Sequence, residues 1–334
     1  MPTYLVTGAA GFIASRVAEM LAQSGATVVG VDNLNNYYDI RLKQHRRERL
    51  SRYDNIQFHE LDIEDRSAVH EVFKAHQFDA VFNLAARAGV RYSLEYPMIY
   101  HSTNAGGNLN LLEEARYAGV RKYILASTSS LYAGQEGPFV ESLPVNEPIS
   151  PYAASKKAAE AMAYAYHHLF EIDVSIVRFF TVYGPAGRPD MSYFRFISWI
   201  DNGIPITVFG DGTQARDFTF VDDIARGTIA AAKPVGYEVI NLGGGNQPYP
   251  LMVLIEKIEN LLGKKAEIDY QPFHSADMMT TWADISKAKQ LLDWEPTTTL
   301  DQGLEKCVQW YRDNLPWSAS LSLETGRVPT QDAS

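Results

Sequence analysis

Cysteine is nearly absent from this sequence, since Cys307 is the only one among 334 residues. A single cysteine cannot form an intramolecular disulfide, so the chain suits a reducing compartment. Cysteines and histidines do not recur at the spacing of metal ligands, and we predict no bound metal. Because cysteine is among the most frequently buried residue types, we expect Cys307 to be a buried helical residue.

Long apolar runs are also missing. No stretch of the sequence approaches the roughly 20 apolar residues that cross a bilayer. The first residues, Met1 to Thr7, lead directly into a strand pattern without a charged leader segment. We therefore predict a cytoplasmic protein with no membrane partner. A hydrophobic content of 46% is enough for a large core.

Positive charge is scarce, because the chain has 30 Lys and Arg residues and 40 Asp and Glu residues, which gives a net charge of −10. Coulomb repulsion then disfavours binding to nucleic acids and anionic membranes, so we predict no nucleic-acid partner. One run, residues 41–50, is locally basic. Leu42 and Leu50 share a helical face within it, which favours a solvated surface helix over a nucleic-acid patch.

Short β-rich apolar runs alternate with amphipathic stretches along the first half of the chain. The apolar runs are 4–7, 27–31, 80–84, 123–126 and 174–177, and the amphipathic stretches include 12–24 and 104–118. Continuous apolar strands separated by helices indicate a parallel sheet that is covered on both faces. The sequence therefore predicts a doubly wound α/β fold.

The pattern of the sequence changes near Gly184, beyond which the predicted elements are shorter and are interrupted by Gly and Pro. We expect residues 1–180 and about 217–242 to form a cofactor-binding domain. Residues of about 181–216 and 243–314 are expected to form a smaller, loop-rich α/β domain that binds substrate. Residues 315–334 are rich in Ser, Thr and Pro, which predicts a flexible tail.

A glycine-rich turn follows the first strand, with Gly8 and Gly11 leading into a helix. The backbone N–H groups and the positive end of that helix suit a pyrophosphate. Asp32 ends the second strand, where its carboxylate can accept both hydroxyls of an adenosine ribose and repel a 2′-phosphate. The pattern favours NAD over NADP. Asp62, at the end of the predicted third strand, can hold the adenine amino group or be structural.

Tyr152 and Lys156 lie four residues apart at the start of a predicted helix that Ser150 caps, so both side chains share one face. Bringing a tyrosine pKa from about 10 to about 7 requires roughly 4 kcal/mol. One cation at about 4 Å and an effective dielectric constant near 20 supplies about that energy. Lys156, aided by the positive nicotinamide ring of NAD⁺, is thus sufficient to make Tyr152 a base, although an exposed surface pair has the same spacing.

A cluster of polar side chains, Ser127 to Ser130, ends a predicted strand at the carboxyl edge of the sheet. Thr128, which belongs to this cluster, precedes Tyr152 by 24 positions. The glycine turn, Thr128 and the Tyr-x-x-x-Lys motif together resemble the extended short-chain dehydrogenase/reductase family, over nearly the whole chain. The resemblance implies a Rossmann-like sheet, NAD as cofactor, Tyr152 as acid/base, Lys156 as ribose ligand and Thr128 as substrate ligand. The third glycine of the family pattern is Ala14 here.

Further stretches resemble the nucleotide-sugar epimerase branch, including 83–86, 178–185 and 216–223. In that branch Arg216 corresponds to a diphosphate ligand and Asp277 to a uridine-ribose ligand. A surface ion pair of Arg216 with Asp217 or Asp211 is the alternative. The stretches 35–39, 88–94 and 179–191 are closest to UDP-glucuronate 4-epimerases.

The resemblance also implies a wider set of contacts. Those predicted to line the cofactor are Phe12, Ile13, Asn33, Ile63, Leu84, Ala85, Ala86 and Asn104. Those predicted to contact the UDP-sugar are Ser127, Ser129, Arg91, Thr181, Arg188 and Val208. Arg87 and His274 depart from the residues expected at their positions, which leaves their roles open.

The implied reaction is 4-epimerisation of a UDP-sugar, most closely UDP-glucuronate to UDP-galacturonate. The hydride on carbon 4 passes to NAD and leaves a 4-keto sugar. The keto sugar then rotates within the site, and the hydride returns to the opposite face of carbon 4. The keto form of glucuronate is a β-keto acid that readily loses CO₂, and we expect Ser129 and Thr181 to hold its carboxylate.

Several other functions fit parts of the same sequence. They are a UDP-glucose or UDP-N-acetylglucosamine 4-epimerase, a UDP-glucuronate decarboxylase, and an NAD-sensing regulatory protein without catalysis. A dehydratase needs an acid just after Thr128, where the chain has Ser129 and Ser130. The family resemblance also implies a homodimer through helices near 98–118 and 152–170.

Overall fold

The computed structural model describes residues 1–272 and 278–324, and its centre is a seven-stranded parallel sheet. In space the strands follow the order β11-β6-β5-β4-β1-β2-β3. They are β1 Thr3–Thr7, β2 Thr27–Asp32, β3 Ile56–Glu60, β4 Ala80–Asn83, β5 Lys122–Thr128, β6 Asp173–Phe179 and β11 Tyr237–Leu242. The chain builds outward from β1 and then returns to β4 on its other side. The predicted doubly wound α/β fold is confirmed.

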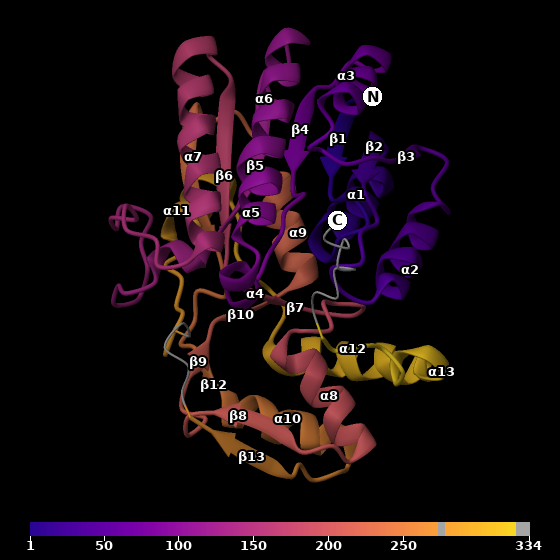
Figure 1. Ribbon diagram of the computed structural model, residues 1–334, viewed down its shortest axis with the longest axis vertical. Helices are drawn as coiled ribbons and strands as arrows, with labels where there is room; N and C mark the ends of the chain where they lie inside the picture. Colours follow the sequence, from indigo (N-terminus) through magenta and orange to yellow (C-terminus); the bar gives the residue numbers. More distant parts are fainter. Residues whose placement is uncertain (273–277, 325–334) are drawn as a thin grey trace, which may run out of the picture.

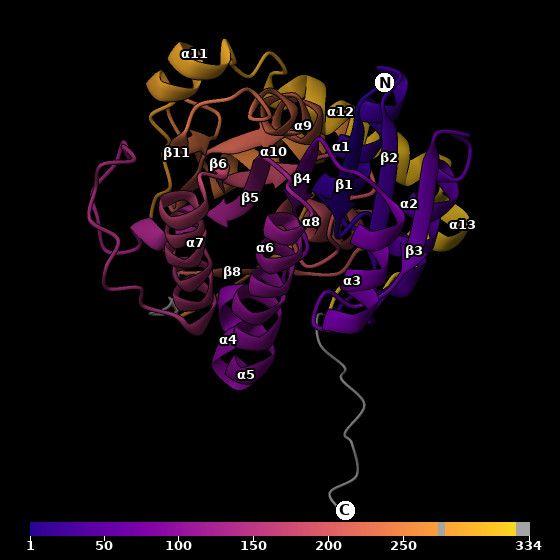
Figure 2. The same cartoon turned by 90° about the horizontal axis from the view of Figure 1, so that it is seen from above.

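Helices cover both faces of this sheet (Figures 1 and 2). The side chains of β1 alternate between two hydrophobic cores. Leu5 packs in the core formed with α3, α6 and α7, and Val6 packs in the core formed with α1 and α9. These helices are α1 Phe12–Gln23, α3 Arg66–Ala75, α6 Asn108–Tyr117, α7 Pro151–Phe170 and α9 Val221–Ala230.

A smaller part of the molecule lies below the large sheet in Figure 1. It contains three two-stranded sheets, β7 with β10, β9 with β12, and β8 with β13. Their strands are β7 Thr181–Tyr183, β8 Ile206–Phe209, β9 Ala215–Arg216, β10 Phe218–Phe220, β12 Tyr249–Pro250 and β13 Ile268–Gln271. The helices around them are α8 Ser192–Asn202, α10 Leu251–Leu262, α12 Leu300–Asp313 and α13 Leu315–Ser318.

The remaining helices lie in the segments between these elements. They are α2 Ile40–Leu50, α4 Val90–Glu95, α5 Pro97–Tyr100, the π-helix η1 His101–Gly107, the 3₁₀ helix η2 Ser129–Tyr132 and α11 Ser286–Leu292. No helix in the described ranges is both long and apolar enough to cross a membrane. The division into two domains stays a prediction. One helix of the second predicted segment, α11, packs against β11 and α9 of the first.

Two predicted boundaries were wrong. The third strand ends at Glu60, so Asp62 lies in the loop beyond it. The helix expected to begin at Asn104 is preceded by a continuous π-helical turn, η1, in which Asn104 is buried. Cys307 is buried in α12, as predicted.

The basic run forms helix α2, with Leu42 and Leu50 buried on one face as expected. The interpretation of the whole run as solvated was wrong, because Arg46 is only 1% exposed. Its guanidinium donates to the carbonyl oxygens of Ala10, Ala186 and Gly187 at 3.0, 2.7 and 3.1 Å. Only a side chain with several fixed donors can satisfy three buried carbonyls at once.

The flexible tail was also predicted too early in the chain. Residues 315–318 form α13, and Leu321 is buried. The Trp317 ring lies 5.6 Å from Trp310 and 5.4 Å from His45, measured between ring centroids. Aromatic burial of this kind stabilises a segment whose composition alone indicates disorder. Residues 325–334 of the predicted tail lie outside the described residues.

Arg46 and its neighbour Arg47 allow a matched test of the buried contacts. We expect Arg46→Met to lower the free energy of unfolding by about 3 kcal/mol or more, because three buried carbonyls lose their donor. The Arg47 side chain is 45% exposed. We expect Arg47→Met to change the same quantity by less than about 1 kcal/mol. Urea denaturation measures both, and similar values for the two variants would contradict the role given to Arg46.

Candidate active site

A cavity of about 250 Å³ opens at the carboxyl ends of β1, β2, β4, β5 and β6. This is the edge at which doubly wound sheets bind ligands. It brings together sixteen of the predicted site residues: Gly8, Gly11, Phe12, Ile13, Asp32, Asn33, Asp62, Ile63, Leu84, Ala85, Ala86, Ser127, Thr128, Tyr152, Lys156 and Arg188. The residues predicted to bind the cofactor and those predicted to catalyse the reaction therefore line the same cavity.

The glycine turn is built on two positions that tolerate no side chain. Gly8 has a φ of +68°, and a Cβ there would lie 2.9 Å from the Cα of Ala85. A Cβ on Gly11 would lie 2.7 Å from the carbonyl oxygen of Gly8. Helix α1 then begins at Phe12 with no side-chain cap on its first N–H groups. Uncapped N–H groups at a helix start, reached through a Cβ-free turn, fit the pyrophosphate of a dinucleotide.

Asp32 lies nearly buried in the cavity wall, and its carboxylate already has several partners. The amides of Ala10 and Leu34 donate to it at 3.2 and 2.8 Å. The ammonium of Lys43 lies 3.2 Å from it, with both side chains almost fully buried. Sequence reasoning placed Lys43 on a solvated helix and missed it, because only the fold brings α2 against the end of β2.

Asp62 lies on the same wall, where its carboxylate accepts the Asn33 side-chain amide at 2.6 Å. Asn33 and Asp62 thus hold each other beside Asp32. The three polar side chains end neighbouring strands or follow them closely, which is the arrangement that the sequence predicted for an adenosine site.

Tyr152 and Lys156 project from the first turns of α7. Ser150 caps this helix, as predicted, by accepting the Ala153 amide at 3.2 Å, and Pro151 occupies its first position. The Lys156 ammonium donates to the Ala126 carbonyl at 2.7 Å. Burial lowers the pKa of Lys156 to about 8, and the charge of Glu160 partly opposes this.

The pKa of Tyr152 differs from the expectation in its causes. Burial raises it above the ordinary value, while a hydrogen bond with Thr128 and the charge of Arg188 lower it. Lys156 was expected to supply that cation, but its ammonium is held by the Ala126 carbonyl on β5. In this arrangement Thr128 and Arg188 favour the phenolate.

A buried polar network lies beneath these residues and was not predicted. Glu160 forms an ion pair with Arg178 at 2.8 Å, both side chains being 3% exposed. The Ser127 hydroxyl donates to the same carboxylate at 2.7 Å. Glu160 follows Lys156 by four residues, just as Lys156 follows Tyr152, so all three side chains share one face of the helix. This spacing was the available signal for Glu160.

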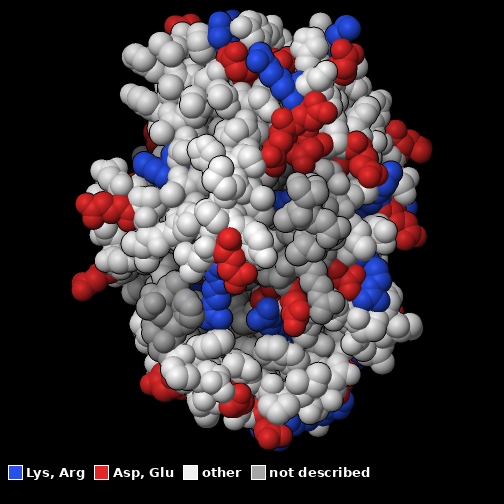
Figure 3. Space-filling model, viewed as in Figure 1, with Lys and Arg blue, Asp and Glu red and all other residues white. Residues whose placement is uncertain are grey.

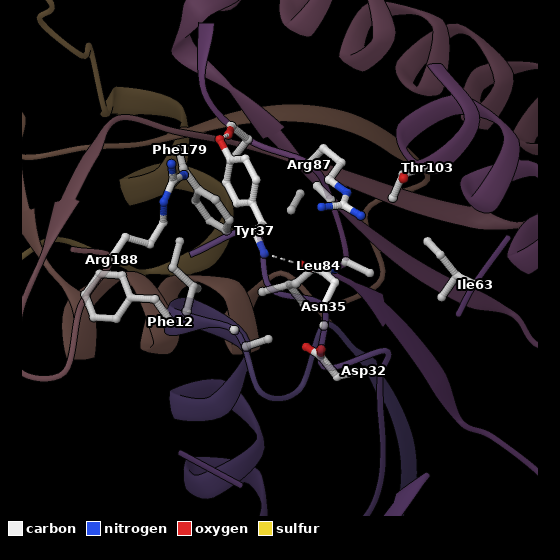
Figure 4. A pocket seen from close by; sticks show the side chains of 18 of the residues that line it. Phe12, Asp32, Asn35, Tyr37, Ile63, Leu84, Arg87, Thr103, Phe179 and Arg188 are labelled. Carbon is white, nitrogen blue, oxygen red and sulfur yellow. Dashed lines mark hydrogen bonds between the residues drawn. The ribbon is translucent and has the colours of Figure 1, made fainter. Parts of the chain in front are cut away.

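Two arginines and a tyrosine, Arg87, Arg188 and Tyr37, also line the cavity. Figure 4 shows Arg87 and Arg188 on opposite sides of the view with Tyr37 between them. Each guanidinium carbon lies 5.8 Å from the centre of the Tyr37 ring. Arg188 is paired with Asp190 at 2.6 Å. Tyr37 and Arg87 line the cavity but were not among the predicted contacts.

Other predicted contacts do not line this cavity. Asn104 is 2% exposed and uses its side-chain amide on the backbone of Arg87. Val208 is fully buried in β8, which leaves it no surface to offer a ligand. Ser129 and Thr181 lie beside lining residues, Ser129 buried and Thr181 partly exposed. Thr181 begins β7.

Two other predicted cations, Arg91 on α4 and Arg216 on β9, are also absent from the cavity lining. The Arg91 guanidinium stacks 4.3 Å from the centre of the Phe209 ring. Arg216 donates to the carbonyls of Ala215 and Met279 at 2.9 and 3.2 Å. Asp277 and His274 lie outside the described residues. Figure 3 shows basic side chains beside a hollow between the two parts of the molecule.

Asp217 does not behave as a surface carboxylate. It is 3% exposed and accepts the amides of Gly244 and Ala283 at 2.6 and 2.8 Å. Burial raises the pKa of Asp217 to about 6, against the opposing effect of these hydrogen bonds. The residue joins three segments of the smaller part, so its role is structural.

The pKa of Lys156 gives a direct test of this electrostatic arrangement. We expect one lysine amino group to titrate near pH 8, well below the usual value of about 10.4. Nuclear magnetic resonance of protein labelled with nitrogen-15 lysine measures it, and the signal should vanish in Lys156→Arg. Because Glu160 raises this pKa, Glu160→Gln should lower it further. Titration of every lysine near pH 10 would rule out the buried ammonium.

Comparisons with known proteins show the family and the fold. The model of the "NAD dependent epimerase/dehydratase family" matches residues 4–243. A UDP-glucuronate 4-epimerase from Thermodesulfobacterium geofontis is 55% identical over 97% of this chain and all of that protein. The crystal structure of the Bacillus cereus UDP-glucuronic acid 4-epimerase in complex with UDP-glucuronic acid and NAD is 37% identical, with a TM-score of 0.88, over 93% of this chain and 99% of that one.

A second solved structure belongs to an enzyme that acts on a neutral sugar. The Thermotoga maritima UDP-glucose 4-epimerase with UDP-glucose is 32% identical, with a TM-score of 0.84, over 94% of this chain and 99% of that chain. The fold is therefore shared by epimerases of both sugar types, and the identity to the first two proteins is higher.

Proposed function

This chain belongs to the NAD dependent epimerase/dehydratase family, and we propose that it catalyses the NAD-dependent 4-epimerisation of UDP-glucuronate to UDP-galacturonate. The observation that carries the proposal is the shared cavity. Tyr152, Thr128 and Arg188 line it together with the glycine turn and Asp32. A dinucleotide and a sugar hydroxyl can thus meet at one phenol.

The acids of the cavity favour epimerisation over elimination. Among the described residues its lining contains two carboxylates, Asp32 and Asp62, and both are held in the predicted adenosine region. A dehydratase needs an acid close to the catalytic tyrosine to expel a hydroxyl. The groups next to Tyr152 are instead a hydroxyl and a guanidinium.

Each residue near the sugar has a separate role in the proposed reaction. Tyr152 takes the proton of the hydroxyl on carbon 4 and later returns it. Thr128 bonds to the phenol and orients it, and the Arg188 charge favours its ionised form. Bound NAD supplies a hydride acceptor that gives the hydride back, so the cycle has no net redox change. Gly8, Gly11 and Asp32 would hold its pyrophosphate and adenosine ribose.

The charged sugar fits the cation in the cavity wall. Arg188 is the guanidinium whose charge acts on Tyr152, so it lies near the reacting carbon and can bind the adjacent carboxylate. A fixed carboxylate is less able to reach the geometry in which the keto intermediate loses CO₂. Ser129 and Thr181, next to the lining residues Thr128 and Phe180, are proposed to donate further hydrogen bonds to it.

Product analysis tests the proposed reaction. Incubation with UDP-glucuronate and NAD should give UDP-galacturonate, detected by proton nuclear magnetic resonance, and Tyr152→Phe should lower the rate by at least about a hundredfold, as loss of general acid–base catalysis does. UDP-glucose and UDP-N-acetylglucosamine are the comparison substrates. A pentose product would identify a decarboxylase, and NAD binding without turnover of any UDP-sugar would favour an NAD-sensing protein.

We also propose a cytoplasmic homodimer with two domains, 1–180 with 217–242 for NAD and 181–216 with 243–314 for the UDP-sugar. The single cysteine of the chain supports a reducing compartment. Support for a dimer comes from large apolar side chains on α5, α6 and α7, which lie on one side of the sheet in Figure 2. Met98, Tyr117 and Leu169 are 75%, 66% and 64% exposed. Large exposed apolar side chains on neighbouring helices are typical of an interface.

Paired glutamate substitutions test the dimer. We expect Met98→Glu combined with Leu169→Glu to convert the protein to a monomer, because an interface core does not accept unpaired charges. Ile204→Glu is the control, since Ile204 is also exposed but follows α8 in the smaller part. Light scattering coupled to size exclusion measures the mass. A monomeric wild type, or a dimer that survives the double substitution, would reject this interface.

A further inference from the structure

Arg87 is the one arginine of the cavity wall whose charge has no counterpart in the described part of the chain. Its Nε atom is buried and has no hydrogen-bond partner. The other arginines buried around the cavity are satisfied: Arg46 donates to carbonyls, and Arg188 is paired with Asp190. A buried donor without an acceptor is costly, so this arrangement points to an acceptor that a ligand supplies.

The backbone of Arg87 is fixed, which directs its side chain. The Arg87 amide donates to Oδ1 of Asn104 at 2.8 Å, and Nδ2 of Asn104 donates to the Arg87 carbonyl at 2.9 Å. The same Nδ2 bonds to the Ser155 hydroxyl at 2.9 Å. Asn104 thus clamps Arg87 to α7 between Tyr152 and Lys156. The backbone of Arg87 is therefore held at the edge of the cavity by the protein itself.

The loop that carries Arg87 lies against the glycine turn. Strands β1 and β4 are direct neighbours, with Thr7 opposite Asn83. The Thr7 hydroxyl accepts the amides of Leu84 and Ala85 at 3.1 and 3.0 Å, so the two loops leave the sheet together. Gly8 approaches Ala85 too closely for any Cβ. Arg87 follows Ala85 by two positions and lines the same cavity as Gly11 and Phe12 at the uncapped start of α1.

The other guanidinium, that of Arg188, is the one assigned to the sugar side of the cavity. Arg188 acts on the phenol of Tyr152. The Arg87 charge acts on Tyr92, whose pKa burial raises and Arg87 partly lowers. The Tyr37 ring separates the two guanidinium groups (Figure 4), with each carbon 5.8 Å from its centre.

We propose that Arg87 binds the diphosphate of the dinucleotide, closing from the β4 side the anion site that the start of α1 forms on the other side. The assignment rests on the use of NAD proposed above, not on the identity of the sugar. A guanidinium offers two parallel N–H donors to phosphate oxygens. Such a contact slows release of the dinucleotide, which an epimerase must retain until the hydride has returned to the sugar.

Nucleotide binding to Arg87→Gln tests the assignment. Calorimetric titration of nucleotide-free protein with NAD, ADP-ribose and adenosine separates the parts of the ligand. We expect Arg87→Gln to weaken NAD and ADP-ribose by at least about tenfold, as loss of a charge-assisted contact does, and to leave adenosine unchanged. Arg87→Lys should recover part of the affinity. Arg52→Gln is the matched control, because the Arg52 side chain is 71% exposed.

Two further measurements distinguish the other outcomes. Without nucleotide, Arg87→Gln should unfold at the same temperature as the wild type or higher, because it removes an unsatisfied buried donor. A lower temperature together with unchanged NAD affinity would give Arg87 a structural role. Weaker binding of UDP-glucuronate with normal NAD affinity would assign Arg87 to the substrate diphosphate. A wild type that does not bind NAD would instead contradict the proposed function.

Discussion

The site depends on one local constraint, the joining of the loops that follow β1 and β4. Thr7 is fully buried, and its hydroxyl donates to the Asn83 side chain at 2.8 Å while accepting the amides of Leu84 and Ala85. This brings the second loop so close that position 8 has no room for a Cβ. The glycine turn, the start of α1 and the backbone that carries Arg87 all take their positions from this contact.

Features with a local sequence signature were predicted well. The strands and helices of the first half follow from apolar periodicity, and Gly8 and Gly11 follow from the steric demands of the turn. The cap of α7 and the common face of Tyr152 and Lys156 follow from helical spacing. In each case the residues that decide the structure lie within a few positions of one another.

Features that depend on distant partners were not predicted. Lys43, Arg46 and Arg47 belong to one basic run, yet the first pairs with Asp32, the second satisfies the carbonyl of Ala186, and the third stays exposed. Nothing in the run distinguishes them, because the acceptors lie up to 141 positions away. The same reason explains why Trp317 orders residues 315–318 against expectation.

The charge of the whole chain is a poor guide to what the cavity binds. The chain carries a net charge of −10, while a UDP-sugar and a dinucleotide diphosphate are both anionic. Exposed carboxylates act only over about 8 Å at physiological salt, so the cavity is governed by its own groups. There Lys43 offsets Asp32 and Asp190 offsets Arg188, while Lys156 meets a carbonyl and Arg87 meets no carboxylate among the described residues. The pattern of pairing within the wall, rather than the number of charges, therefore makes the cavity receptive to anions.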